Sequence, residues 1–292
     1  YISTLEDLIM YSKGYRLIRD RNQPGMPRQY SIVGKTGETI TSLSGTADIV
    51  KYDFGYEIDP VWEAGNKNIP GIYIEFKEPW LNPKGFEQIV YDVLANTQDM
   101  NIIEKPEPED TPFYINNGTI NVGNTNGKVI LQTFSLESLV RVAEVFQGKV
   151  PMCFLLWKGT GATDLTYDDP LGYASFINLG VKYKAHFIGP CIAGAPNDYP
   201  ELDQPWQDYL IHRAKMKNHP YTFDTYDQMA KYFGQYNFGV EIDGKYKAPY
   251  LDALFTNHSD MSINYMITQG WRKSPASETL VDAKVVLERL GY

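Results

Sequence analysis

The sequence has few cysteines, no excess of positive charge and no long apolar run. Its 292 residues include only two cysteines, Cys153 and Cys191, too few for a disulfide framework or a cysteine zinc site. One disulfide remains open, but two separate buried thiols are the favoured prediction. A formal net charge of −9 argues against nucleic acid or an anionic membrane surface as the main partner. No apolar stretch is long enough to cross a bilayer, so we predict no membrane span.

What is present is the composition of a folded globular protein, with 43% hydrophobic and 22% charged residues. No signal-peptide pattern follows Tyr1. The 22 tyrosines, the acidity and two glycosylation sequons, at Asn117 and Asn257, favour an extracellular, cell-surface or periplasmic protein, or one of the secretory lumen. We interpret residues 1–292 as a single domain that carries two insertions.

The N-terminal part predicts one helix followed by a β-rich insertion. Residues 3–13 begin with a Ser-Thr-Leu-Glu capping pattern and place apolar residues on one helical face before Gly14. Residues 15–68 then carry Pro-Gly and Thr-Gly turn signals between short alternating runs, which predicts an inserted β-rich excursion. Residues 101–127 are rich in Pro, Asn and Gly, and we interpret them as a loop insertion.

From Gly71 onward, short apolar runs alternate with stretches of helical spacing. We predict six strands, within 71–80, 128–134, 150–157, 183–190, 216–223 and 250–256. Helices are expected at 83–97, 135–147, 169–179, 206–214, 275–290 and from Asp224 through Tyr232. This alternation predicts parallel βα units, in either an open doubly wound sheet or a TIM-type (β/α)8 barrel.

The positions of polar residues help to choose between these two folds. Five of them lie at or just beyond the ends of the predicted strands: Glu75, Lys77, Gln132, Tyr221 and Thr256. Barrel enzymes collect their active-site residues at such strand ends. No Gly-x-Gly-x-x-Gly or phosphate-loop pattern follows any strand, which weakens the dinucleotide-binding alternative. We therefore predict a TIM-type barrel, with about six of its eight strands encoded in this chain.

The strand within 71–80 carries the two charged candidates. Side chains two residues apart on a strand share a face, so Glu75 and Lys77 are expected to point the same way. From these residues alone, the pair is either a structural ion pair or charge delivered to a site.

Five segments occur in an order that points to one family. They are Ser3-Thr-Leu-Glu-Asp-Leu8, Gly71-Ile-Tyr-Ile-Glu-Phe-Lys-Glu-Pro-Trp80, Val129-Ile-Leu-Gln-Thr-Phe134, His219-Pro-Tyr-Thr-Phe223 and Leu251-Asp-Ala-Leu-Phe-Thr256. Together they resemble the glycerophosphodiester phosphodiesterase family, in particular its larger periplasmic and plant-type members. The resemblance implies a barrel that uses a divalent cation, Ca²⁺ or Mg²⁺, to hydrolyse glycerophosphodiesters to glycerol 3-phosphate and an alcohol.

The resemblance also implies roles for individual residues. Glu75 would be a metal ligand, because hard cations prefer carboxylate oxygens. Lys77 would add a point charge to phosphate oxygens, and Gln132 and Tyr221 would bind substrate.

The sequence lacks the family motifs that precede the Thr-Leu-Glu helix. It contains no His-Arg-Gly, and the Glu-x-Asp metal ligands and second catalytic histidine of that region are missing. Its four histidines, His186, His212, His219 and His258, lie outside matching motifs, so the catalytic residues stay unassigned. His219 is interpreted as a structural histidine. We expect a companion polypeptide or a missing N-terminal segment to complete the barrel, and a homo-oligomer is also compatible with the sequence.

Two alternatives remain open. Asn257 stands where the family usually has Asp, and a glycan there would crowd a substrate, which favours a non-catalytic descendant acting as an extracellular structural or binding protein. A sugar-processing barrel with Glu75 and Asp252 as paired carboxylates is the other alternative, but it does not explain the order of the motifs.

Overall fold

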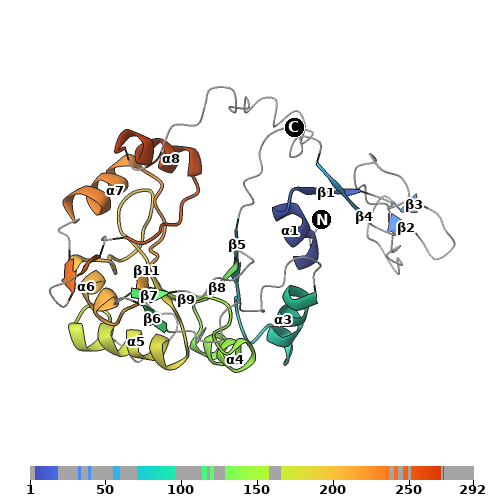
Figure 1. Ribbon diagram of the computed structural model, residues 1–292, viewed down its shortest axis with the longest axis horizontal. Helices are drawn as coiled ribbons and strands as arrows, with labels where there is room; N and C mark the ends of the chain where they lie inside the picture. The colour runs from blue at the N-terminus through green and yellow to red at the C-terminus, as the bar shows by residue number, and fades with distance from the viewer. Residues whose placement is uncertain are drawn as a thin grey trace. The chain divides into compact units, whose positions relative to one another are not determined.

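The structure is a computed structural model that describes residues 4–18, 55–59, 71–96, 129–157, 166–236, 251–270 and 272, with short strand segments between them. By its contacts the chain divides into two compact units, Tyr1–Ile72 with Ala276–Tyr292, and Tyr73–Pro275 (Figure 1). A single domain over the whole chain stays a prediction. Within the described residues, no helix is both long enough and apolar enough for a membrane span.

The first unit begins with helix α1 (Leu5–Ser12). The Thr4 hydroxyl accepts a hydrogen bond from the Asp7 amide, and the Asp7 carboxylate accepts one from the Thr4 amide. This is a capping box, displaced by one residue from the predicted Ser-Thr-Leu-Glu pattern. The Tyr56 hydroxyl also donates to Asp7, which ties the following strands to the helix start.

The strands of the first unit lie inside the predicted 15–68 insertion. Strand β1 (Tyr15–Ile18) pairs antiparallel with β4 (Gly55–Ile58), and β2 (Ile32–Val33) pairs antiparallel with β3 (Thr39–Ile40). The described residues of this segment thus form short antiparallel strand pairs, and its being an insertion stays a prediction.

A five-stranded parallel sheet forms the centre of the second unit. Its strands are β5 (Ile72–Glu75), β8 (Val129–Thr133), β9 (Met152–Leu156), β10 (Phe187–Pro190) and β11 (Lys217–Asn218). Their spatial order is the same as their order along the chain. A doubly wound sheet reverses its strand order at a switch point, and the described strands contain no such reversal. The fold is thus mixed α/β with a parallel sheet wound in one direction, consistent with a TIM-like fold.

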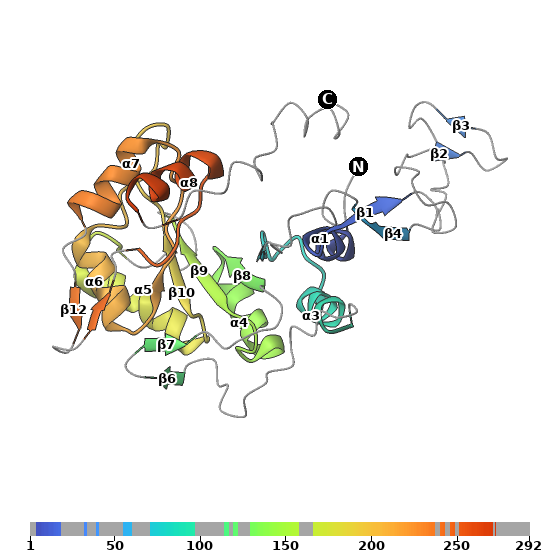
Figure 2. The same ribbon diagram turned by 45° about the horizontal axis from the view of Figure 1, so that its top comes forward.

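Helices follow most of these strands. They are α3 (Phe86–Asn96), α4 (Leu136–Phe146), α5 (Pro170–Lys182), α6 (Pro205–Arg213), α7 (Tyr226–Ala230) with a π-helical turn over Lys231–Gln235, and α8 (Ser259–Thr268). Because parallel crossovers are right-handed, an unbroken strand order places the connecting helices on one face of the sheet. Figure 2 shows α4, α5 and α6 in succession beside β8, β9 and β10.

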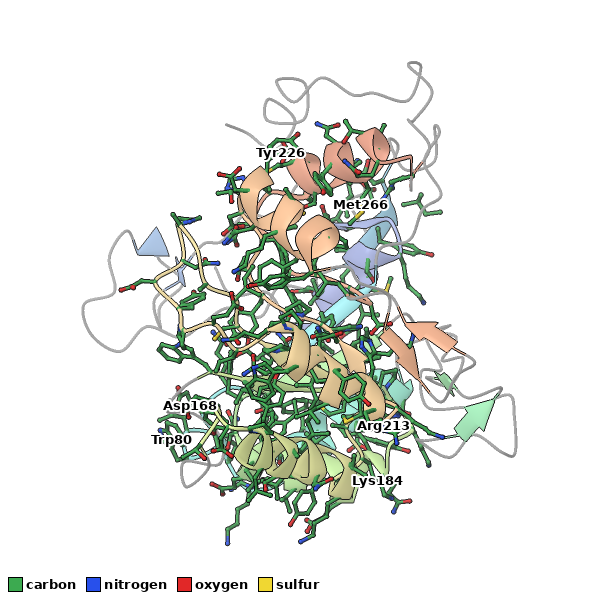
Figure 3. The ribbon with its side chains drawn as sticks, turned by 90° about the vertical axis from the view of Figure 1, so that its left-hand side faces the viewer. Trp80, Asp168, Lys184, Arg213, Tyr226 and Met266 are labelled. Atoms are coloured by element: carbon green, nitrogen blue, oxygen red, sulfur yellow. The ribbon has the colours of Figure 1, made fainter. Side chains whose placement is uncertain are left out.

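The segments that follow the strands and the segments that follow the helices lie on opposite sides of the unit (Figure 3). Figure 3 shows Trp80 and Asp168, from the segments that follow β5 and β9, on one side of the unit. Lys184 and Arg213, from the ends of α5 and α6, lie on the opposite side (Figure 3). Residues that follow a strand thus gather at the first edge, where parallel α/β proteins bind ligands.

Local sequence explains the best-formed elements. Strand β9 is buried along its whole length, as expected for an interior parallel strand made of one apolar run. Ser135 caps α4 by accepting from the Ser138 amide, and Asp169 caps α5 by accepting from Leu171 and Gly172. In β10, a Cβ on Gly189 would lie 2.6 Å from a Leu155 methyl carbon and 2.9 Å from the Cys153 sulfur, so a larger residue would have to displace these side chains.

The end of the chain departs from the prediction in two places. The segment 250–256 forms no regular strand in its described part, because the Asn218 carbonyl accepts from both Asp252 and Ala253. It still runs beside the end of β11, since Phe255 donates to the Pro220 carbonyl. Helix α8 was not predicted, and the helix predicted at 275–290 lies outside the described residues.

The cap of α7 is also corrected. Thr225, not Asp224, caps this helix, because Thr225 and Gln228 form a reciprocal capping box. The predicted loop insertion at 101–127 contains a two-stranded hairpin, β6 (Tyr114–Asn116) with β7 (Thr119–Asn121), and its other residues lie outside the described part. A further hairpin pairs β12 (Val240–Ile242) with β13 (Tyr246–Ala248).

A buried polar cluster joins α6, β11 and the 251–256 segment. His212 places Nδ1 3.0 Å from an oxygen of Asp208 and Nε2 2.9 Å from an oxygen of Asp252. The Asn218 side-chain nitrogen donates to Asp203 and Asp208, and the Asn218 backbone N–H donates to the Asp252 carboxylate. Burial alone would lower the pKa of His212, but its bonds to the two carboxylates raise the pKa to about 10. His212 is therefore a protonated imidazolium at pH 7, held between the side chains of Asp208 and Asp252.

We expect His212→Gln to destabilise the protein by about 3–5 kcal/mol at pH 7, because it leaves two buried carboxylates without their cation. The His212 pKa rises from 6.5 to about 10 on folding, so its stabilisation is complete below pH 6.5 and is lost as the pH passes through about 10. Urea unfolding at pH 7 and pH 10 should show a steeper loss of stability in the wild type than in the variant. The control is His258→Gln, at an exposed position without a side-chain cap bond. Equal pH dependence in the wild type and His212→Gln would contradict this assignment.

Candidate functional site

A pocket of about 220 Å³ lies at the edge of the sheet where the strands end. It is lined by Glu75, Gln132, Phe134, Leu155, Tyr221, Thr222, Phe255, Thr256 and Asn257. Four of the five polar residues singled out in the sequence therefore share one pocket. The fifth, Lys77, is not part of the lining but lies beside Glu75.

Glu75 is the acidic group of this pocket. It ends strand β5, and its side chain is 22% exposed. One carboxylate oxygen lies 3.9 Å from the Lys77 ammonium, and the other accepts a hydrogen bond of 3.3 Å from the Gln132 amide nitrogen. Burial raises the pKa of Glu75, and the Lys77 charge and the Gln132 bond partly oppose this shift. Since Lys77 is 73% exposed, the ion pair itself adds little to stability.

Gln132 brings a second oxygen to the same place. Its amide nitrogen is used by Glu75, which leaves the amide oxygen buried without a hydrogen bond from any described group. A buried carbonyl oxygen without a partner costs free energy, which a cation or a donor on a ligand would recover. The pocket lining therefore includes a carboxylate and, on the side chain bonded to it, a buried amide oxygen without a described partner.

These two oxygens fit part of a site for a hard divalent cation. Ca²⁺ and Mg²⁺ are bound by carboxylate and amide oxygens, usually with water and substrate oxygens in addition. Within the described residues, no group of three or more His, Cys, Asp or Glu side chains is placed to hold a metal ion. Glu75 and Gln132 could supply two ligands, and the others would have to come from elsewhere.

Tyr221 contributes its ring rather than its hydroxyl. The hydroxyl donates to the Leu156 carbonyl at 3.0 Å, and burial raises its pKa well above the usual range. The ring lies against Phe134, with centroids 5.7 Å apart and planes at 88°. The residue is thus fixed in place and presents an apolar wall to the pocket.

Asn257 lies at the exposed rim of the pocket. Its backbone and side-chain nitrogens both donate to the Asp224 carboxylate at 2.9 Å. A glycan would be attached to the same side-chain nitrogen, so glycosylation would disturb this bond and crowd the pocket. The other sequon, at Asn117, lies outside the described residues.

Three histidines are used inside the fold, away from the pocket lining. His186 accepts a hydrogen bond from the Met152 amide, and His212 belongs to the buried cluster. His219 stacks on Phe187 at 4.0 Å and lies 3.1 Å from the Tyr73 hydroxyl. Burial lowers the pKa of His219 to about 4, so it is neutral at pH 7. This geometry supports the structural interpretation of His219.

The cysteines and Asp252 take no part in the pocket either. Cys153 and Cys191 are both free and buried, which confirms the prediction of two separate thiols. Burial raises the pKa of each to about 12. Asp252 is held by His212 and is absent from the pocket lining, so the structure does not bring Glu75 and Asp252 together as paired carboxylates.

The sequence reasoning missed the aromatic side of the site. Phe134 and Phe255 line the pocket, and Trp157 and Tyr199 extend from Tyr221 toward the surface. Phe134 and Trp157 directly follow strands β8 and β9. The rule that selected polar residues at strand ends would have found them, had it been applied to aromatic residues as well.

Comparison with known proteins gives a distant structural likeness and no match in sequence. No protein-family model matches the sequence, and no curated protein sequence matches it. A solved structure, of a protein classed as a glycerophosphoryl diester phosphodiesterase from Silicibacter pomeroyi DSS-3, is similar with a TM-score of 0.45 and 10% sequence identity. The match covers 73% of this chain and 55% of that chain, so this chain spans about half the length of the solved structure.

The Glu75 environment can be tested by titration. Lys77→Met should raise the pKa of Glu75 further, because the Lys77 charge opposes the effect of burial. The measurement is a carboxyl-carbon NMR titration of the wild type and the variant. The control is Lys84→Met, which removes an equal charge from an exposed position nine residues after Glu75. This variant should leave the pKa of Glu75 unchanged. A Glu75 pKa that falls in Lys77→Met would show that this lysine does not act on the carboxylate.

Proposed function

We propose that this chain carries part of the active site of a metal-dependent glycerophosphodiester phosphodiesterase. The reaction would release glycerol 3-phosphate and an alcohol. The observation that carries the proposal is the Glu75 carboxylate, which accepts a hydrogen bond from the Gln132 amide nitrogen, together with the Gln132 amide oxygen, which has no described donor. Both residues line a pocket where the strands end, and they belong to two of the five segments that resemble the family.

Several residues in and beside the pocket have separate roles in this proposal. Glu75 and Gln132 would hold a Ca²⁺ or Mg²⁺ ion. When bound, such an ion offsets negative charge on the phosphodiester. The exposed Lys77 ammonium beside Glu75 would attract the phosphate oxygens as a point charge. The rings of Phe134 and Tyr221 would form the wall against which the alcohol part of the substrate lies.

We further propose that the remaining parts come from a companion polypeptide or from a segment preceding this sequence. These parts are two histidines for acid and base chemistry, two acidic ligands and the strands that close a (β/α)8 barrel. Support comes from the sheet, in which β5 pairs on one side only among the strands that the structure describes. The described histidines also support it, because His186, His212 and His219 are held within the fold. The sequons support an extracellular, periplasmic or secretory location.

A non-catalytic descendant of the family is the second candidate function. The observation that favours it is Asn257, which stands at the pocket rim in place of the family's Asp and is bonded to Asp224. In that case the pocket would bind a ligand without hydrolysing it, and the protein would serve as an extracellular structural or binding module.

The first test is hydrolysis of glycerophosphocholine by the isolated 292-residue chain. We expect no release of glycerol 3-phosphate with Ca²⁺ or Mg²⁺ added, because the described pocket holds no histidine for proton transfer. The measurement is an enzyme-coupled assay for glycerol 3-phosphate. Clear turnover by the isolated chain would show that the active site needs no further segment.

The second test uses the native protein, whose intact mass would show whether other segments belong to it. Glu75→Gln keeps the size of the side chain but removes the ligand charge, and should lower metal-dependent turnover roughly 100-fold or more. Lys84→Gln is the matched surface control and should retain activity. If the wild-type native protein is folded but inactive on glycerophosphodiesters, the non-catalytic alternative holds. If it is active and Glu75→Gln is equally active, Glu75 is not a metal ligand.

A further inference from the structure

The most exposed large apolar side chains lie in segments that follow strands of the sheet. Leu171 is 78% exposed, Leu81 74% and Trp80 72%, more than any other large hydrophobic residue in the part of the chain that the structure describes. Trp80 and Leu81 follow strand β5, and Leu171 stands in the first turn of α5, after β9. Single exposed apolar residues are ordinary, but three at this level in such segments indicate an interaction surface. We call these three residues the apolar tips.

The apolar tips occupy one side of the second unit. Figure 3 shows Trp80 and Asp168 on the same side, and Leu171 comes three residues after Asp168. Tyr226, another exposed aromatic residue, lies well apart from Trp80 (Figure 3). The tips come from separate segments, because β8 stands between β9 and β5 in the sheet. A broad, flat partner can therefore contact both segments at once.

The turn that carries Trp80 is fixed at its base. Pro79 is buried, and its carbonyl accepts a hydrogen bond of 3.2 Å from Arg141 of helix α4. The Asn82 side chain donates to the Lys77 carbonyl at 2.9 Å, and the Asn82 backbone N–H donates to the Pro79 carbonyl at 3.2 Å. The turn is thus ordered before a partner arrives, which reduces the entropy cost of binding.

The chemistry of the Trp80 turn suits the boundary between water and lipid. Within the described residues, the Trp80 indole N–H is given no hydrogen-bond acceptor. Tryptophan is enriched at the headgroup level of membranes, where the ring is in apolar surroundings and the N–H still finds an acceptor. The neighbouring Leu81 offers apolar area that a lipid surface would remove from water.

Charge indicates which kind of lipid surface fits. Lys77 and Glu78, of opposite sign, are both exposed just before Trp80, and Asp168 is exposed near Leu171. Anionic lipids are recognised by clustered Lys and Arg, and they would repel a chain with a formal net charge of −9. Zwitterionic headgroups carry both signs and no net charge, so they match the mixed charges beside the apolar tips.

A protein segment explains these residues less well. Strands that complete the barrel would pair with the backbone of β5, whereas Trp80 and Leu81 lie beyond the end of that strand. A bound peptide would need a groove, and the described pocket is lined by none of the apolar tips.

We propose that the apolar tips dock this chain on the surface of a zwitterionic phospholipid bilayer. Trp80 and Leu81 enter the headgroup layer, and Leu171 makes a second contact. Docking goes beyond the proposed phosphodiesterase activity and does not depend on it, because it uses exposed side chains outside the pocket lining.

The test is binding of the 292-residue chain to phosphatidylcholine vesicles, without metal or substrate, measured by vesicle sedimentation. Binding should persist at about 0.5 M salt, because the contact is apolar. Vesicles with bromine on the acyl chains should quench part of the tryptophan fluorescence. No binding to phosphatidylcholine, or binding only after an anionic lipid is added, would overturn the proposal.

Variants assign the contact to the apolar tips. Trp80→Ala should weaken vesicle binding about tenfold, and Leu171→Ala about threefold or more. Trp80→Phe should recover part of the binding but lose the quenching by brominated lipid. The control is Tyr226→Ala, which removes a 51% exposed aromatic residue away from Trp80 and should bind like the wild type. Circular dichroism would verify that each variant is folded.

Several results would refute the docking surface. Wild-type binding by Trp80→Ala or Leu171→Ala, or full quenching in Trp80→Phe, would show that other residues make the contact. Self-association without lipid that Trp80→Ala abolishes would identify a second copy of the chain as the partner. Absence of vesicle binding by the native protein, with any companion segments present, would show that those segments cover the apolar tips.

The docking proposal and the phosphodiesterase proposal fail in different ways. If the native protein binds vesicles through Trp80 but hydrolyses no glycerophosphodiester, only the phosphodiesterase proposal fails. If it hydrolyses soluble glycerophosphocholine but binds no phosphatidylcholine vesicle, only the docking proposal fails.

Discussion

The register between β5 and β8 is the constraint on which the site depends. The Phe76 amide donates to the Gln132 carbonyl at 2.8 Å, and the Thr133 hydroxyl donates to the Phe76 carbonyl at 2.7 Å. These bonds bring the preceding residue, Glu75, level with the Gln132 side chain. A slip of one residue would turn Glu75 to the other face of the sheet and separate the two oxygens. The chemistry of the pocket is thus set by backbone pairing between residues more than fifty positions apart in sequence.

Much of the second unit could be predicted because its signals are local. Strand β9 is a single apolar run, and helix α4 has both a serine cap and helical spacing, so neither needs distant contacts to be identified. The same holds for Glu75 and Gln132, each of which stands at the end of its own strand. Their mutual hydrogen bond could not be predicted, since it depends on which strands become neighbours.

The features that escaped prediction are those created by tertiary contacts. The 251–256 segment has the composition of a strand, but the Asn218 carbonyl receives two of its amides and interrupts the ladder. The His212 cluster joins residues from α6, β11 and this segment. Asp208 and His212 are four residues apart on one helix, but nothing local in the sequence indicates that Asp252 contacts them. The contact between Phe134 and Tyr221 in the pocket is assembled in the same way, from two segments that each contribute one ring.

The two cysteines give this protein a built-in reporter of its own opening. Cys153 lies in the middle of the sheet on β9, and Cys191 directly follows β10. Both thiols are fully shielded from solvent, and a pKa of about 12 leaves almost no thiolate at neutral pH. A thiol-specific reagent can therefore react only with molecules whose sheet has come apart. The labelling rate of each cysteine would measure how often that part of the sheet opens, without any dye or mutation.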